Sequence, residues 1–197
     1  MLPLHLKILK PVIQKIIKET SREGALKIID PVMADNGKLY PGFAEDFPQK
    51  MAQLCKEADV ILPNITEACL LLGIPYPAEN YDKAFIEKMC ADLHKMGAKN
   101  VVVTGVSFEK DKLGVAVYDG HSVEYYFTER LPVQMHGTGD AFASAFAGTY
   151  CRGWSLLKAA SLAADFVVES IKATLDDKDH WYGVKFEKAI PFLTSRL

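Results

Sequence analysis

The sequence predicts an α/β protein built on a largely parallel sheet, and three observations support this. Short apolar, β-branched segments alternate with longer segments whose apolar residues recur at helical spacing. Such alternation is typical of parallel strands connected by helices that flank both faces of a sheet. After Gly105, two alternating segments surround Asp119-Gly120, which indicates an antiparallel hairpin at one sheet edge. The length of 197 residues and the 49% hydrophobic content favour one domain over residues 1–197.

Each element has a local signal. Asp30-Pro31 and Pro63 end the first two strands, because proline cannot donate a backbone hydrogen bond. Thr66 is expected to cap a helix that ends at Gly73. We expect strands over 26–29, 59–62 and 101–105, hairpin strands over 113–118 and 122–128, and helices over about 9–20, 48–57, 66–73, 82–96, 138–151, 155–174 and 186–193.

Composition excludes several classes of function. A net charge of −2 without a Lys/Arg block argues against nucleic-acid binding. No segment reaches the roughly 18 to 20 apolar residues that a membrane span needs, and lysines interrupt the apolar start, so we expect neither a membrane protein nor a secretory signal. The four cysteines are widely spaced without a CxxC pair, which predicts reduced thiols in a cytoplasmic protein. A small-molecule partner remains.

The strongest local signal is Gly137-Thr138-Gly139-Asp140, followed by the small residues 141–148. Glycines let backbone N–H groups approach an anion, and a helix beginning here directs its free N–H groups and positive dipole end to the same point. This predicts a phosphate-binding turn in which Asp140 accepts a proton from a substrate hydroxyl. The alternative is an ordinary cap, in which Thr138 and Asp140 serve only the helix.

Other polar residues follow predicted strands, where open α/β sheets bind ligands. Asn64 and Glu67, three residues apart at a helix start, offer oxygens suited to hydrated Mg²⁺ and its phosphates. Thr104 lies at the end of the next strand and can hydrogen-bond a phosphate. Taken singly, capping explains Asn64, and a turn-forming Asp-Pro step explains Asp30. Their joint placement with the glycine-flanked Asp140 favours a phosphoryl-transfer site.

Four segments resemble, in order and spacing, motifs of the ribokinase-like superfamily, specifically its vitamin-kinase branch of pyridoxal and hydroxymethylpyrimidine kinases. They are DPVMADNGKLY (30–40), LPNITEACLLLG (62–73), VVVTG (101–105) and HGTGDAFASAFAG (136–148). The resemblance covers nearly the whole chain and implies a ribokinase-like fold. The DPVMxDNGxLY pattern is more similar to the pyridoxal kinases, so we favour that family.

The resemblance also implies roles for individual residues. Asp140 would be the catalytic base that activates the substrate's hydroxymethyl oxygen, and the amides of Gly137, Thr138 and Gly139 would form the anion hole. Adenine would lie between the loops after Gly105 and before Gly137 and the helix that contains 164–168. The remaining matched positions are Asp30, Asp35, Asn64, Thr104 and Gly105 for the ATP phosphates, and Glu67 and Asp30 for Mg²⁺.

Two departures from the family pattern stand out. Ala34 replaces a common glycine, and its methyl group would restrict a backbone conformation that needs positive φ. Relatives also begin with a further β-α-β-rich portion that contacts the pyridine ring. A sheet without it would expose an unpaired edge. A misassigned start or cloned fragment, a dimer that covers the edge, or a degenerate nucleotide-binding protein would each explain this, and a homodimer is expected by resemblance.

The leading hypothesis is therefore an ATP-dependent, Mg²⁺-requiring kinase that phosphorylates pyridoxal, pyridoxine or pyridoxamine, with a requirement for a monovalent cation left open. Positioning and charge neutralisation would dominate in-line transfer. One alternative is a hydroxymethylpyrimidine or phosphomethylpyrimidine kinase of thiamine synthesis. Another, from a different class, is a non-catalytic nucleotide-binding protein.

Overall fold

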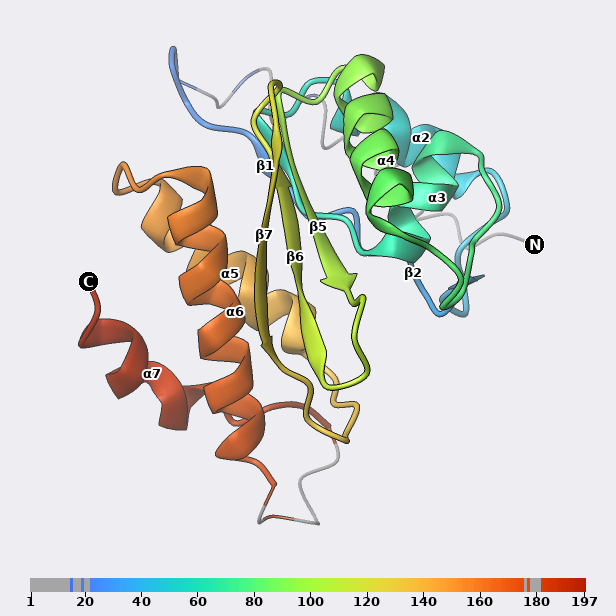
Figure 1. Cartoon of the computed structure of the whole chain (residues 1–197). Helices are drawn as coiled ribbons and strands as arrows, with labels where there is room; N and C mark the ends of the chain where they lie inside the picture. Colours follow the sequence, from blue (N-terminus) through green and yellow to red (C-terminus); the bar gives the residue numbers. More distant parts are fainter. Residues whose placement is uncertain (1–14, 16–18, 20–21, 176, 178–181) are drawn as a thin grey trace. The chain divides into compact units, whose positions relative to one another are not determined.

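The computed structural model describes residues 15, 19, 22–175, 177 and 182–197, which form two compact units (Figure 1). The first unit contains the described residues up to Thr104 together with Tyr118–Ser122. The second contains Gly105–Val117 and Val123–Leu197. The helix predicted for residues 9–20 lies outside the described residues, apart from 15 and 19.

The first unit is built on parallel strands. Strand β1 (Ile28–Ile29) pairs with β4 (Val60–Ile61), which pairs with the start of β5 (Asn100–Val106). All three predicted strands are present, although the regular parts of β1 and β4 are only two residues long. Val60, Ile61 and the first valines of β5 are fully buried, as expected for parallel strands covered by helices.

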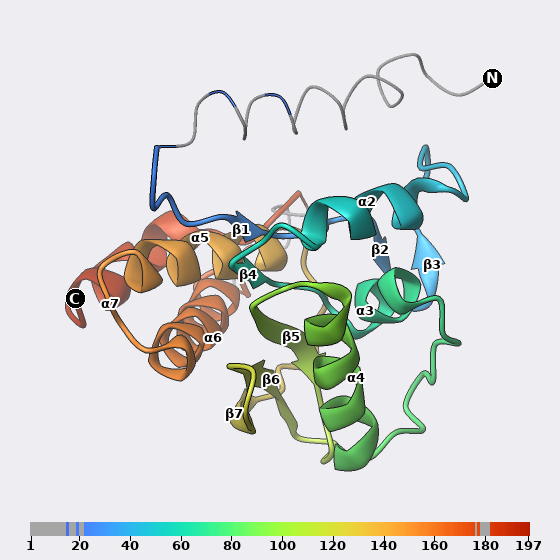
Figure 2. The same cartoon turned by 90° about the horizontal axis from the view of Figure 1, so that it is seen from above.

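Three helices belong to this unit: α2 (Phe47–Cys55), α3 (Ile65–Leu72) and α4 (Lys83–Met96). Helix α3 packs against both α2 and α4, and Figure 2 shows the three side by side. The predicted stop of α3 is confirmed, because Gly73 adopts the left-handed conformation there. The predicted start is wrong. Asn64 rather than Thr66 is the N-cap, because its extended backbone and short amide side chain precede the first helical turn.

The segment after Asp30 contains a small hairpin where we expected only a loop. Strand β2 (Ala34–Asp35) pairs antiparallel with β3 (Lys38–Leu39). The two connecting residues, Asn36 and Gly37, have φ angles of 51° and 76°. Positive φ at both central positions is the geometry of a type I′ turn, which Asn-Gly favours.

The second unit holds β6 (Lys112–Tyr118, with its last residue in the first unit), β7 (Val123–Glu129), α5 (Thr138–Tyr150), α6 (Leu156–Lys172) and α7 (Phe186–Thr194). Helix α6 packs against α5, α7 and β7 (Figure 1). Buried alanines on α5 and α6, among them Ala145 and Ala163, let the two backbones approach closely.

The strand order β1-β4-β5-β6-β7 confirms the predicted α/β class, with a mainly parallel sheet and a hairpin at one edge. The described part of the chain has no helix that is both long and apolar enough to cross a bilayer. Three cysteines, Cys55, Cys69 and Cys90, are buried free thiols, and Cys151 is an exposed one. Burial raises the pKa of Cys55 and of Cys90 to about 12, which keeps both thiols protonated and unreactive.

Candidate functional site

The start of helix α3 is closed by its own side chains. The Oδ1 atom of Asn64 accepts a hydrogen bond from the backbone N–H of Glu67 at 2.9 Å. In return, Oε2 of Glu67 accepts one from the backbone N–H of Asn64, also at 2.9 Å. This reciprocal pair is a capping box, so Asn64 caps helix α3, as the capping interpretation states.

Glu67 also holds the segment after Asp30. Its Oε1 atom accepts hydrogen bonds from the backbone N–H groups of Met33 at 3.0 Å and Ala34 at 3.4 Å. The side-chain amide of Asn64 donates to the carbonyl of Ala34 at 2.8 Å. The Asn64–Glu67 pair thus fixes both the helix start and a backbone more than thirty positions earlier in the chain.

The environment of Glu67 alters its titration. Glu67 is only 4% exposed, and this burial raises the pKa of its carboxyl group to about 7. The N–H donors of Asn64 and Met33 oppose the rise, whereas the negative charge of Asp30 adds to it. Asp30 directly follows β1, the strand that pairs with β4, and its place in a phosphate and metal site with Glu67 stays a prediction.

The hairpin carries the other predicted acidic residue at its turn. Asp35 is exposed, and its two carboxylate oxygens accept hydrogen bonds from the backbone and side-chain N–H groups of Asn36, at 2.8 and 3.0 Å. The expectation that Ala34 restricts a positive-φ conformation is wrong, because Ala34 lies in strand β2 without positive φ. Its methyl group is fully buried.

Thr104 joins the same corner through the backbone. It forms an isolated parallel bridge with Asn64, and its N–H donates to the carbonyl of Pro63 at 2.9 Å. Thr104 is partly exposed, and the next residue, Gly105, is exposed with a φ of 76°. The first unit thus brings Asp30, Asn64, Glu67 and Thr104 together beside the β2–β3 hairpin that bears Asp35.

The start of helix α5 is built differently. Gly137 is the N-cap in the left-handed conformation, with a φ of 78°, and no side chain of the described residues caps the helix. The hydroxyl of Thr138 donates backwards to the carbonyl of Met135 at 3.4 Å. Gly139 has open space where a side chain would stand. Asp140 is exposed, and no described residue donates a hydrogen bond to its carboxylate.

These contacts disfavour the ordinary-cap alternative for the GTGD turn. Neither Thr138 nor Asp140 accepts a hydrogen bond from the first-turn amides, so the described residues leave these amides available to an anion. The Asn64–Glu67 group belongs to the first unit and the GTGD turn to the second. Their convergence on one pocket stays a prediction.

The donor set fits a magnesium ion that arrives with a nucleotide. Among the described residues, no three His, Cys, Asp or Glu side chains form a metal-binding group. Mg²⁺ needs only one or two protein carboxylates when phosphate and water supply its other ligands. A carboxylate has about four acceptor positions, and Glu67 uses three of them on backbone amides. Asp30 and Asp35 are the other predicted carboxylates of this corner.

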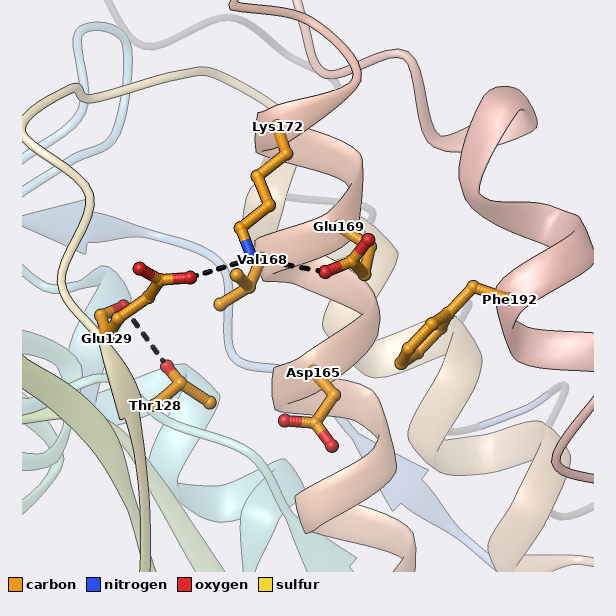
Figure 3. A pocket seen from close by; sticks show the side chains of 7 residues that line it. All are labelled: Thr128, Glu129, Asp165, Val168, Glu169, Lys172 and Phe192. Atoms are coloured by element: carbon orange, nitrogen blue, oxygen red, sulfur yellow. Dashed lines mark hydrogen bonds and ion pairs between the residues drawn. The ribbon is translucent and has the colours of Figure 1, made fainter.

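A separate hollow of about 300 Å³ lies in the second unit between β7, α6 and α7 (Figure 3). Lys172 forms ion pairs with Glu129 at 2.7 Å and Glu169 at 3.3 Å, and Asp165 accepts a hydrogen bond from the hydroxyl of Tyr126 at 2.8 Å. Three carboxylates against one ammonium make this pocket unsuitable for phosphates. It includes Asp165 and Val168 of the predicted adenine segment, where adenine contact stays a prediction.

Comparison with known proteins identifies relatives that match most of the chain. The profile of the family described as phosphomethylpyrimidine kinase matches residues 7–184. A pyridoxine kinase of Bacillus subtilis is 32% identical over 165 residues, which cover 80% of this chain and 59% of that protein.

Two solved structures are also similar. A putative phosphomethylpyrimidine kinase from Bacteroides thetaiotaomicron, crystallised with pyridoxal, has a TM-score of 0.86 and 31% identity. The match covers 94% of this chain and 66% of that one. An ADP complex of Bacillus subtilis pyridoxal kinase has a TM-score of 0.70 and 28% identity, covering 88% of this chain and 63% of that one.

The chain thus spans less than two thirds of the length of each of these relatives. The profile match nevertheless covers most of its residues, and the structural matches agree with the mainly parallel fold. The predicted ribokinase-like, pyridoxal-kinase relationship is confirmed: this chain belongs to the phosphomethylpyrimidine kinase family.

Proposed function

We propose that this chain is the nucleotide-binding part of an ATP-dependent kinase that phosphorylates the hydroxymethyl group of pyridoxal, pyridoxine or pyridoxamine. The observation that carries the proposal is the start of α5, where, among the described residues, nothing donates a hydrogen bond to the exposed Asp140 and no side chain binds the first backbone amides. A phosphoryl-transfer enzyme needs both a proton acceptor and an anion hole.

In this proposal Asp140 accepts the proton of the substrate hydroxymethyl group as its oxygen attacks the γ-phosphorus of ATP. The amides of Gly137, Thr138 and Gly139 stabilise negative charge on the transferring group. ATP is supported by family membership and by the relative that was crystallised with ADP. The substrate class is supported by the pyridoxine kinase and by the relative crystallised with pyridoxal.

Mg²⁺ would neutralise the charge of the triphosphate. Asp30 and Glu67 are the proposed metal-side carboxylates, and Asp35, Asn64, Thr104 and Gly105 the proposed phosphate-side residues. The buried Glu67 contributes negative charge and holds the Met33–Ala34 backbone in place. A homodimer also belongs to the proposal, and light scattering of the purified protein tests it.

A second candidate has an observation of its own. The matching family is described by its phosphomethylpyrimidine kinases, and the pyridoxal-bound relative is itself described as a putative phosphomethylpyrimidine kinase. Phosphorylation of a hydroxymethylpyrimidine uses the same base and anion hole. The two candidates therefore differ in how the heterocycle is held, and not in the transfer step.

Turnover measurements test both candidates. Purified protein is assayed with Mg·ATP and either pyridoxal or hydroxymethylpyrimidine, and ADP release is followed by a coupled reaction. We expect pyridoxal to give the higher kcat/KM, and Asp140→Asn to lower kcat at least about 100-fold, since a positioned general base contributes roughly 10² to 10⁴. Mg·ADP affinity, measured by calorimetry, should change little.

Asp82 offers a matched control. It also lies at a helix start, but its carboxylate accepts a hydrogen bond from the N–H of Phe85 at 2.9 Å and caps α4. Asp82→Asn retains a capping side chain and should keep turnover unchanged. Near-normal turnover of Asp140→Asn would remove Asp140 from the base role. Mg·ADP binding without any transfer would support the non-catalytic alternative.

A further inference from the structure

Thr66 anchors the tip of the β2–β3 hairpin. Its side-chain Oγ1 accepts a hydrogen bond from the backbone N–H of Gly37 at 3.0 Å. Thr66 is only 2% exposed, so water has little access to this hydrogen bond. The Asn64–Glu67 pair holds the other end of the same hairpin, at Ala34. Helix α3 and its N-cap therefore form hydrogen bonds with both the base and the tip of the hairpin.

A second contact reinforces the tip from outside. A Cβ atom added to Gly37 would lie 2.6 Å from Cδ1 of Tyr76, which means that the Tyr76 ring is packed directly on the glycine. Tyr76 stands between Pro75 and Pro77, whose rings restrict the backbone around it. Gly37 of the exposed turn is thus contacted by both the Thr66 hydroxyl and the Tyr76 ring.

The residue that this arrangement orients is Asp35. It is the last residue of β2, and its carboxylate is bound to the next residue of the turn, Asn36. If the turn moves, the carboxylate moves with it. Holding the N–H of Gly37 therefore restrains the turn whose Asn36 binds the Asp35 carboxylate.

We propose that Thr66 is a positioning residue, whose hydroxyl holds the Asp35 carboxylate in the orientation that receives the Mg·triphosphate. The ligand named in this inference, the Mg·triphosphate, rests on the proposed function. The hydrogen bond from Gly37 to Thr66 does not depend on that function. A merely structural role, filling space in the first turn of α3, needs no hydroxyl. Valine has nearly the same shape as threonine and serves as the discriminating substitution.

The experiment compares Thr66→Val with Thr66→Ser in the full chain. Hydrogen exchange at the Gly37 amide should become about tenfold faster in the valine variant, because one hydrogen bond is lost. Mg·ADP affinity should fall and the KM for Mg·ATP should rise, each about fivefold, with kcat nearly unchanged. The serine variant keeps the hydroxyl and should restore all three quantities to within about twofold of the parent.

A double-mutant cycle with Asp35→Asn completes the test. If Thr66 acts through Asp35, adding Thr66→Val to Asp35→Asn should weaken Mg·ADP binding no further. Additive losses of Mg·ADP affinity in the double variant would overturn the inference. An unchanged exchange rate of the Gly37 amide in Thr66→Val would also overturn it, and so would faster exchange with unchanged Mg·ADP affinity. Absence of turnover in the parent protein would instead count against the proposed kinase function, because exchange and Mg·ADP affinity are measured without catalysis.

Discussion

The starts of helices α3 and α5 look alike in the sequence but are built in opposite ways. At α3, Asn64 and Glu67 occupy each other's backbone N–H groups, and Glu67 is buried. At α5, a left-handed glycine replaces the capping side chain, and Asp140 is exposed. A helix start whose amides are already bound by side chains stabilises the fold, whereas one with free amides can bind an anion. The first therefore stabilises the fold, whereas the amides of the second are not bound by any side chain of the described residues.

The strongest test of this difference removes the carboxylates of Glu67 and Asp140 in separate variants. Glu67→Ala removes the acceptor for three backbone N–H groups, two of them in a buried segment, and should cost about 3 kcal/mol or more of unfolding free energy. Asp140→Ala removes a carboxylate that accepts no hydrogen bond from the described residues, and its urea midpoint should match that of the parent. Equal losses of unfolding free energy in the two variants would contradict the comparison, because both carboxylates would then stabilise the fold to the same extent.

The titration of Glu67 provides the second test. Burial raises its pKa from 4.5 to about 7, so the folded state binds a proton that the unfolded state releases between these values. Glu67 therefore favours folding most below about pH 5 and loses that contribution as the pH rises to about 7. The shift corresponds to at most about 3 kcal/mol.

Urea unfolding of the parent and of Glu67→Gln at several pH values between 5 and 8 measures this contribution. The parent should lose stability relative to the glutamine variant as the pH rises, because glutamine does not titrate. Other groups, such as the ion-paired Asp59, are shared by both proteins and cancel in the difference. A constant difference between the two proteins would mean that the three N–H donors outweigh burial and hold Glu67 ionised throughout.

Much of this organisation was accessible from sequence. The alternation of strands and helices predicted the sheet, and the glycines of the GTGD turn predicted where α5 begins. The β2–β3 hairpin was missed, although Asn36-Gly37 is the strongest short-range signal for such a turn. The spacing of Asn64 and Glu67 is likewise a capping-box signature, which would have corrected the start predicted at Thr66.

Other features lie beyond local patterns. No spacing indicates that the second oxygen of Glu67 reaches the amides of Met33 and Ala34, because tertiary packing brings that segment to the helix. The hydroxyl of Thr66 on Gly37 has the same origin. Sequence patterns identify residues with suitable chemistry, whereas the fold decides which of them are consumed by internal hydrogen bonds.

The smallest expected effect concerns the open helix start itself. Gly139 and Gly148 both lie in α5, and a Cβ added to either would meet nothing within 4 Å. Alanine at either position should leave the fold intact or slightly more stable, because alanine favours helix over glycine by up to about 1 kcal/mol. Only at Gly139 would the added methyl group enter the space where the phosphate is proposed to lie. Gly139→Ala should therefore weaken binding of a non-hydrolysable Mg·ATP analogue about tenfold in calorimetry while Gly148→Ala leaves it unchanged, and equal affinities would place the transferring phosphate away from this turn.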